Sequence, residues 1–377
     1  MRFIPYGKQL INQDDIDSVV DVLKSDFLTT GPKIIEFEEA LSNYCGAKYC
    51  VVVSSGTSAL HLSSLVLLNK GDKVLTTPNS FLATSNSILY AGAKPIFVDI
   101  AKDGNIDLDI CEDKLKNDNT IKAIYGVAFS GNMLNQEKLK YLKNTYNIKI
   151  LEDNAHSIGA NYNGIKSGSC LNSDIGIFSF HPVKHITTAE GGAITTNSKE
   201  IYEKLLHLRN HGTVKTPQMK PWEYEMRELG FNYRITDMQC ALGISQLKKL
   251  PTFLSRRVEI AKKYDALFEN TIVKPLYKFT TKSSYHLYVV KVDFTKLSIS
   301  KVELFTKLKE KNIGIQLHYM PINKQPYYKD LGYGDEITPI MDNYYEECFS
   351  LPIYPLLSDD EQHYVINNLF EVLKDES

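Results

Sequence analysis

Short apolar runs alternate with longer amphipathic segments along the chain between residues 49 and 210. The short runs are rich in β-branched residues and end at turn residues, which predicts buried strands. The longer segments carry apolar residues at helical spacing, which predicts helices. We expect strands over 49–54, 73–77, 95–98, 121–128, 148–152, 175–180 and 192–196, and helices over 57–68, 80–91, 135–146 and from Ser198 to just before Gly212.

This alternation is typical of an α/β fold with a mostly parallel sheet that helices cover on both faces. The last third of the chain loses the alternation. There we expect helices over 250–270, 301–311 and 359–375, and strands over 285–292 and 314–319. We therefore predict a large α/β domain over 1–250 and a smaller α+β domain over 251–377, with the boundary near Leu250–Pro251.

Composition and charge argue against several classes of protein. The 377 residues include 43 basic and 45 acidic side chains, so the net charge of −2 calls for neither nucleic acid nor an anionic membrane as a partner. No apolar run approaches the about 18 residues of a membrane span, and the N-terminus has no signal-peptide pattern. The six cysteines form no CxxC pair, and no Cys/His set has zinc spacing. We expect free thiols in a reducing cytoplasm and no metal.

Polar residues follow two of the predicted strands, at the edge of a parallel sheet where ligands bind. Ser54-Ser-Gly-Thr-Ser58 opens a helix, and its free N–H groups and hydroxyls suit an anion. Its spacing is neither GxGxxG nor a Walker loop, so no nucleoside triphosphate is implied. Glu152-Asp-Asn-Ala-His156 offers a carboxylate to a cationic nitrogen. The simpler alternative for both segments is a polar helix cap.

A lysine lies in the loop after a third strand, within Ser179-Phe-His-Pro-Val-Lys184. Most lysines are solvated, but a desolvated one has a lowered pKa and can form a Schiff base. The neighbouring His181 and His185 are more often structural than catalytic in such a loop. Further on, Tyr233 and Arg234 precede a helix; they either pack internally or reach a neighbouring subunit's site.

An anion-binding loop, a carboxylate and a loop lysine together fit one cofactor, pyridoxal 5′-phosphate (PLP). PLP needs a phosphate cradle, an acid that keeps its pyridine nitrogen protonated, and a lysine that forms a Schiff base with its aldehyde. The lysine is released when a substrate amine arrives, and it can then shuttle a proton. The sequence therefore predicts a PLP enzyme.

At these residues the chain resembles the DegT/DnrJ/EryC1/StrS nucleotide-sugar aminotransferases, which are PLP enzymes of fold type I with an aspartate-aminotransferase-like architecture. The resemblance runs from about Leu28 to the final helix, and its motifs include 55–60, 77–84, 92–99, 152–156, 179–184, 188–192, 232–234 and 316–319. Residues 102–107 and 222–243 are most similar to 4-aminotransferases of the pseudaminic acid pathway. Asn154 and His185 depart from the pattern, which carries a small residue and proline there.

The resemblance implies a role for each candidate residue. Lys184 forms the Schiff base, Asp153 pairs with the pyridine nitrogen, and His156 contacts the phenolic oxygen. Phe81 stacks on the cofactor ring. The phosphate is held by Gly56, Thr57 and Ser179, and by Asn232 from the other subunit, which makes the active unit a homodimer with shared sites. Arg234 is a candidate for the substrate diphosphate, and the candidates for sugar or uridine contact are Tyr6, Thr29, His318 and Tyr319.

The implied activity moves an amino group from L-glutamate to C4 of a UDP-4-keto-6-deoxy-N-acetylhexosamine, giving a UDP-4-amino-sugar for pseudaminic acid. Two half-reactions through one site imply ping-pong kinetics. One alternative is the same transfer to another nucleotide 4-ketosugar, of the bacillosamine or perosamine type. A PLP lyase or dehydrase and a non-catalytic relative are further alternatives. The intact Lys184 argues against the family's dehydratases, which carry histidine there, and Lys184 with Asp153 argues against lost catalysis.

Overall fold

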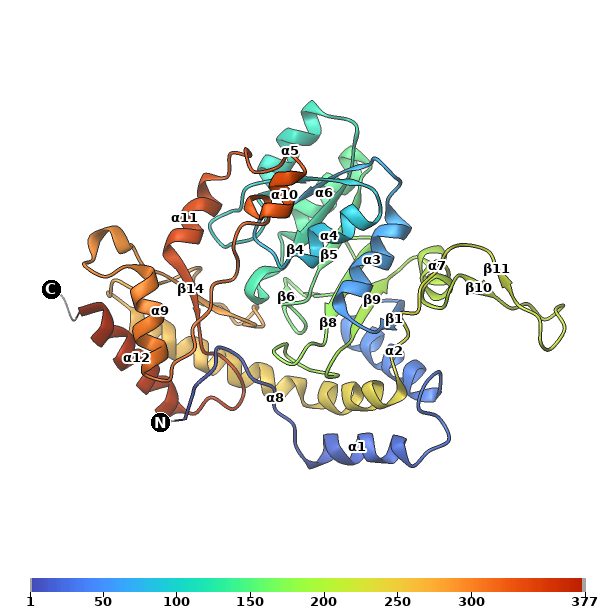
Figure 1. Cartoon of the computed structure of the whole chain (residues 1–377), viewed down its shortest axis with the longest axis horizontal. Coiled ribbons are helices and arrows are strands. Elements are labelled where there is room, and N and C mark those ends of the chain that lie inside the picture. The colour runs from blue at the N-terminus through green and yellow to red at the C-terminus, as the bar shows by residue number, and fades with distance from the viewer. Residues whose placement is uncertain (1, 375–377) are drawn as a thin grey trace.

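The computed structural model describes residues 2–374, and a seven-stranded sheet forms the centre of this range (Figure 1). Its spatial order is β1-β9-β8-β5-β4-β2-β3. Four neighbouring pairs are parallel, and β9 runs antiparallel to both of its neighbours. The predicted mostly parallel sheet is confirmed. Its strands are β1 (Tyr49–Val53), β2 (Lys73–Thr76), β3 (Lys94–Phe97), β4 (Ile121–Val127), β5 (Lys149–Asp153), β8 (Ile175–Ser179) and β9 (Gly192–Thr196).

Successive residues of a strand face opposite sides of the sheet, so each strand feeds two cores. Val51 and Val53 of β1 belong to one core, and Cys50 and Val52 belong to another. Helices cover both sides (Figure 1). They are α2 (Pro32–Cys45), α3 (Gly56–Leu67), α4 (Ala83–Tyr90), α5 (Leu108–Asn117), α6 (Gln136–Tyr146) and α7 (Lys199–Arg209), and the short strands β6 (Asn161–Tyr162) and β7 (Ile165–Lys166) pair beside them.

A single long helix, α8 (Asp237–Phe268), runs along the molecule from the sheet to the C-terminal part (Figure 1). The sequence predicted a helix after Asp237 and a separate one from Leu250; the structure joins them in one helix, so the predicted start at Leu250 is wrong. Thr236 forms a capping box with Gln239, and the helix then continues through Pro251. The predicted domain boundary thus falls inside α8, and the division into domains over 1–250 and 251–377 stays a prediction.

The C-terminal part packs around its own core, which contains residues between 260 and 373. It holds a three-stranded sheet of β12 (Lys274–Pro275), β13 (Tyr288–Lys291) and β14 (Cys348–Leu351), and the helices α9 (Lys301–Glu310), α10 (Pro326–Asp330), α11 (Pro339–Glu347) and α12 (Asp359–Lys374). The end predicted for the last helix, at 375, lies outside the described residues. The strand predicted over 314–319 is wrong, because only Gln316 bridges Ser350 before the segment turns into a cavity.

The N-terminal strap, residues 4–10, joins the two parts of the molecule. Ile4 pairs with Ile313 and is buried in the C-terminal core. The Tyr6 carbonyl accepts a hydrogen bond from Ile353 N at 3.0 Å. The Leu10 carbonyl accepts one from Gln246 Nε2 on α8 at 2.9 Å. Helix α1 (Gln13–Leu23) then packs along α8, and neither α1 nor α2 was predicted from the sequence.

A hairpin of β10 (Thr213–Val214) and β11 (Glu225–Met226) projects away from the body of the chain (Figure 1). We call residues 213–229 the arm. Its tip and base expose large apolar side chains, among them Trp222 and Leu229. The cysteines are all buried and unpaired. Between residues 2 and 374, no helix is long and apolar enough to span a membrane, and no three potential metal ligands cluster.

Candidate active site

A cavity of about 560 Å³ opens where β5 and β8 end and α3 begins. Neighbouring parallel strands end at the same edge of a sheet, so loops that are far apart in sequence meet there. Ten of the predicted site residues line this cavity: Tyr6, Gly56, Thr57, Phe81, Asp153, His156, Ser179, Lys184, His318 and Tyr319.

The first turn of α3 forms one wall. Ser55 is the N-cap residue and accepts a hydrogen bond from Ser58 N at 3.0 Å, so the capping interpretation of this loop is correct for Ser55. Gly56 and Thr57 nevertheless line the cavity at the positive end of the helix dipole. A Cβ atom on Gly56 would lie 2.8 Å from Ser179 Cβ, so only glycine allows this approach. The turn suits a phosphate group.

The Asp153 carboxylate stands at the end of β5 and is 4% exposed. Its Oδ2 accepts a hydrogen bond from Thr84 Oγ1 at 2.6 Å, and its Oδ1 accepts one from Ala155 N at 3.1 Å. Burial raises the pKa of Asp153, and these two hydrogen bonds oppose the rise. A cation beside this carboxylate would relieve the cost of its burial. Sequence analysis assigned no role to Thr84, because its partner Asp153 lies 69 residues away.

Lys184 lies in the loop after β8, and its backbone N–H donates to the His181 carbonyl at 2.9 Å. Burial of the amine lowers the pKa of Lys184 to about 8, although the nearby Asp153 favours the charged form. A fraction of this amine is therefore neutral near pH 7, as a Schiff-base nucleophile requires. His181 borders the cavity too, whereas His185 turns inward and is buried.

Aromatic and histidine side chains form the wall opposite α3. The Tyr319 hydroxyl lies 3.2 Å from His156 Nε2, and the Phe81 ring, 60% exposed, is centred 6.3 Å from the Tyr319 ring. Burial first, and Lys184 second, hold the pKa of His156 well below its usual range. His318 Nδ1 contacts Ser350 Oγ at 2.9 Å, and burial lowers the pKa of His318 to about 3. Both imidazoles are thus neutral.

Three predicted site residues lie outside the cavity of their own chain. Thr29 pairs with Thr236, and Asn232 pairs with Asn210. Arg234 Nη1 donates to Asn210 Oδ1 at 2.6 Å. Conversely, the cavity is lined by further residues to which sequence analysis assigned no role: Ser80, Thr84, Glu190, His286 and Gln316. His286 sits in a predicted strand with no motif around it, so no sequence signal marked it.

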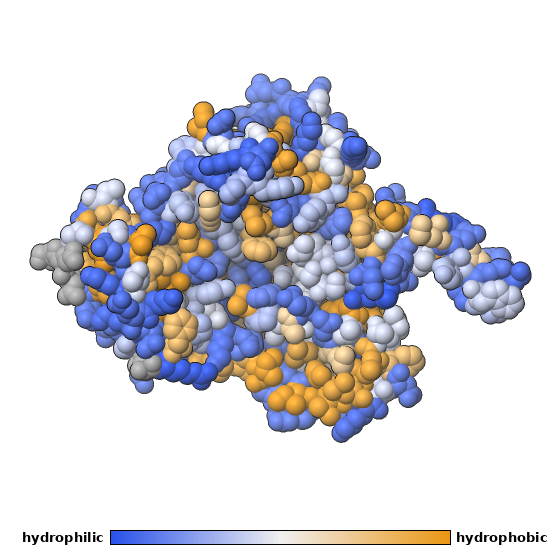
Figure 2. Space-filling view, viewed as in Figure 1, coloured by the Kyte–Doolittle hydropathy of each residue, from blue (hydrophilic) through white to orange (hydrophobic). Residues whose placement is uncertain are grey.

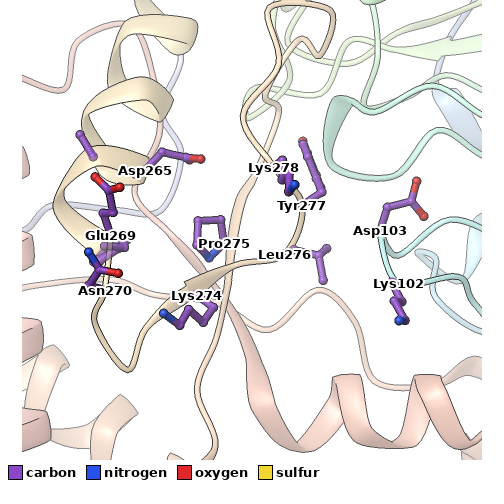
Figure 3. Close-up of a pocket in the computed structure, with 12 residues that line it drawn as sticks. Lys102, Asp103, Asp265, Glu269, Asn270, Lys274, Pro275, Leu276, Tyr277 and Lys278 are labelled. Carbon is purple, nitrogen blue, oxygen red and sulfur yellow. The ribbon is translucent and has the colours of Figure 1, made fainter.

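A second hollow, of about 720 Å³, lies between the end of α8, the β12 segment and the loop after β3 (Figure 3). Asp265 lies on α8, Glu269 and Asn270 follow its end, and Lys102 and Asp103 stand apart from them on another loop (Figure 3). Asp265 already accepts a hydrogen bond from the Tyr288 hydroxyl at 2.7 Å. The acidic and basic groups along this hollow do not converge on one position, so the hollow does not have the arrangement of a ligand-binding site.

The residues of the first cavity fit PLP. Gly56 adds no side chain to the α3 turn, where a Cβ atom would meet Ser179. The buried Asp153 carboxylate matches a cationic ring nitrogen, and Lys184 brings a partly neutral amine into the same cavity. The buried Nδ1 atom of His156 has no hydrogen-bond partner. The α3 turn, the Asp153 carboxylate and the Lys184 amine thus meet in one cavity, and their roles toward the cofactor stay predictions.

The chain belongs to the DegT/DnrJ/EryC1/StrS aminotransferase family, which it matches over residues 9–370. Its architecture is PLP fold type I, and it is a PLP-dependent nucleotide-sugar aminotransferase. It is 44% identical over 377 residues, 98% of each chain, to a UDP-4-amino-4,6-dideoxy-N-acetyl-beta-L-altrosamine transaminase of Campylobacter jejuni subsp. jejuni serotype O:23/36.

Two solved structures are similar over nearly the whole chain. Helicobacter pylori PseC, an aminotransferase involved in the biosynthesis of pseudoaminic acid, has a TM-score of 0.93 and 32% identity, covering 99% of this chain and 100% of that one. The PLP form of the putative sugar aminotransferase Spr1654 from Streptococcus pneumoniae has a TM-score of 0.90 and 31% identity, covering 99% of each chain.

Proposed function

We propose that the protein transfers an amino group from L-glutamate to C4 of a UDP-4-keto-6-deoxy-N-acetylhexosamine, giving a UDP-4-amino-sugar for pseudaminic acid synthesis. The observation that carries this proposal is Lys184, whose amine of lowered pKa shares a cavity with the buried Asp153 carboxylate. The choice of sugar is supported by the printed activity of the Campylobacter jejuni relative and by the similarity to PseC.

Bound PLP supplies an electron sink that stabilises negative charge at the carbon losing its proton. Lys184 would link to the cofactor and would be the group that moves the proton. Asp153 would hold the proton on the pyridine nitrogen, because a neighbouring positive charge favours its buried carboxylate, as Lys184 does in the chain itself. The α3 turn with Gly56, Thr57 and Ser179 holds the phosphate. Phe81 covers the ring, and the neutral His156 hydrogen-bonds the phenolic oxygen.

The active unit in this proposal is a homodimer. A UDP-sugar brings a diphosphate and glutamate brings two carboxylates, but no arginine of residues 2–374 lines the cavity. Asn232 and Arg234 lie outside their own cavity and therefore serve the partner's. Thr29, beside them at Thr236, is assigned to the same shared region. Figure 2 shows apolar side chains gathered over α1 and the loops beside it; they include Ile11, Ile16, Leu23, Phe27 and Leu28, which a second copy would cover.

An absorbance spectrum of the purified, PLP-loaded enzyme tests the reaction. Glutamate should abolish the visible band by converting the cofactor to its pyridoxamine form, and the UDP-4-keto-sugar should restore it. Restoration by a keto-sugar of the bacillosamine or perosamine type alone would replace the proposed substrate. A band that ignores glutamate and every keto-sugar would favour a PLP lyase. No band after reconstitution would contradict the proposal.

A further inference from the structure

Three imidazoles lie against one another in a wall of the active-site cavity. We call His156, His286 and His185 the histidine stack. The ring centroids of His156 and His286 are 4.3 Å apart, and those of His286 and His185 are 5.4 Å apart. They come from the loop after β5, the segment leading into β13 and the loop after β8. All three are buried, and only His156 and His286 border the cavity.

Hydrogen bonds hold both ends of the histidine stack. His156 Nε2 meets the Tyr319 hydroxyl at 3.2 Å, and His185 Nε2–H donates to the Ser284 carbonyl at 3.0 Å. The three Nδ1 atoms are buried without a partner. An imidazolium carries N–H groups on both nitrogens, so protonating any of these rings would leave a charged donor buried and unsatisfied. The geometry favours three neutral rings.

Neighbouring charges oppose protonation as well. Cations approach the stack from two elements, Lys184 in the loop after β8 and Arg257 on α8, and both disfavour an imidazolium. Asp153 acts on Lys184, and Glu190 is a second acid that lines the cavity. The other titratable groups that line it are His181, His318, Tyr319 and Tyr6. Burial is the largest cause that holds the pKa values of all three stacked histidines far below the usual range.

The position of His286 is set by its backbone. Arg257 is 1% exposed, and its Nη1 donates to the carbonyls of Tyr285, His286 and Ile353 at 3.1, 3.2 and 3.0 Å. Within residues 2–374, no carboxylate forms an ion pair with Arg257, and burial lowers the pKa of its guanidinium. This buried guanidinium therefore ties α8 to the backbone of the segment that carries His286, whose ring lies against His156.

We propose that His286 is a positioning residue for transamination. Its ring excludes water from the side of the His156 ring that it contacts. The His156 imidazole is thereby held in place as a neutral hydrogen-bonding group beside PLP. The inference rests on the proposed function, in which His156 contacts the cofactor. Arg257 acts one step further out, through the His286 backbone. A protonated His156 would instead add a second cation next to Lys184 and weaken the cofactor's link to that amine.

The test compares His286→Ser, which admits water, with His286→Phe, which keeps a dry aromatic contact. His363→Ser on the exposed surface of α12 is the matched control. The visible band of each PLP-loaded enzyme is titrated from pH 5 to 8, and kcat/KM is measured over the same range. In His286→Ser the pKa of His156 should rise toward about 6.5, which adds one ionisation and lowers kcat/KM about fourfold at pH 6. His286→Phe and the control should titrate like the wild type.

A second variant, His286→Asn, repeats the wetting substitution with less loss of volume and replaces the serine variant if that protein does not fold. Adding His156→Gln to either variant should remove the new ionisation, which would assign that ionisation to His156. Identical titrations for serine, asparagine and wild type would overturn the proposal. So would equal loss of PLP in the serine and phenylalanine variants, because His286 would then only fill space. A wild-type band indifferent to glutamate would instead contradict the proposed function.

Discussion

Replacing Thr84 by valine tests how the protein prepares the acid of its active site. The Thr84 hydroxyl donates to Asp153 at 2.6 Å in a buried setting. A hydrogen bond to a charged group contributes about 1.5–3 kcal/mol. Since 1.36 kcal/mol corresponds to one pKa unit, its loss should raise the pKa of Asp153 by about 1–2 units. The valine has nearly the same volume, so the surrounding core should be little disturbed.

The sign follows from the form that the hydrogen bond favours. Thr84 stabilises the ionised carboxylate of Asp153, so removing the Thr84 hydroxyl raises the pKa of Asp153. When the pH is lowered, the activity of the variant should therefore begin to fall at a higher pH than that of the wild type. The acid limb of kcat/KM against pH is predicted to move upward by about 1–2 units, with weaker PLP binding on that side. Thr84→Ser keeps the hydroxyl and is the control. An unmoved acid limb in Thr84→Val would refute the reasoning.

Three further predictions concern Lys184, Gly56 and Asn232. Lys184→Ala should lose the visible band of the linked cofactor and the turnover of both half-reactions; wild-type activity in this variant would show that the assignment is wrong. Gly56→Ala places a Cβ atom 2.8 Å from Ser179 Cβ, so PLP affinity, measured by fluorescence titration, should weaken by about tenfold or more with little change in Tm. Mixing inactive Lys184→Ala and Asn232→Ala subunits should restore about a quarter of wild-type activity. Half of the dimers should be hybrids, and each hybrid has one intact site out of two. No recovery of activity would contradict shared sites.

The sheet and the centre of the site could be predicted from the sequence because both have local signals. Short β-branched runs mark the strands; Asp153 ends one of them, and Gly56 and Lys184 lie in the segments that follow two others. Thr84 lies within the motif 77–84, but neither it nor His286 carried a signal for its contact, because these contacts are made to partners far away in the chain. The strand expected at 314–319 failed for a related reason: its apolar pattern serves a cavity wall rather than a sheet.

The N-terminal strap has a consequence for how the protein is made. Ile4 lies at the start of the strap, yet the core that buries it is built from residues 260–373, which are synthesised much later. The carbonyl of Tyr6 likewise accepts its hydrogen bond from Ile353, which is synthesised much later. Contacts of such long sequence separation form late, because the loop between them must close first. The strap therefore has no core to pack against until residues 260–373 have been synthesised, and the cavity that Tyr6 lines is completed only after that.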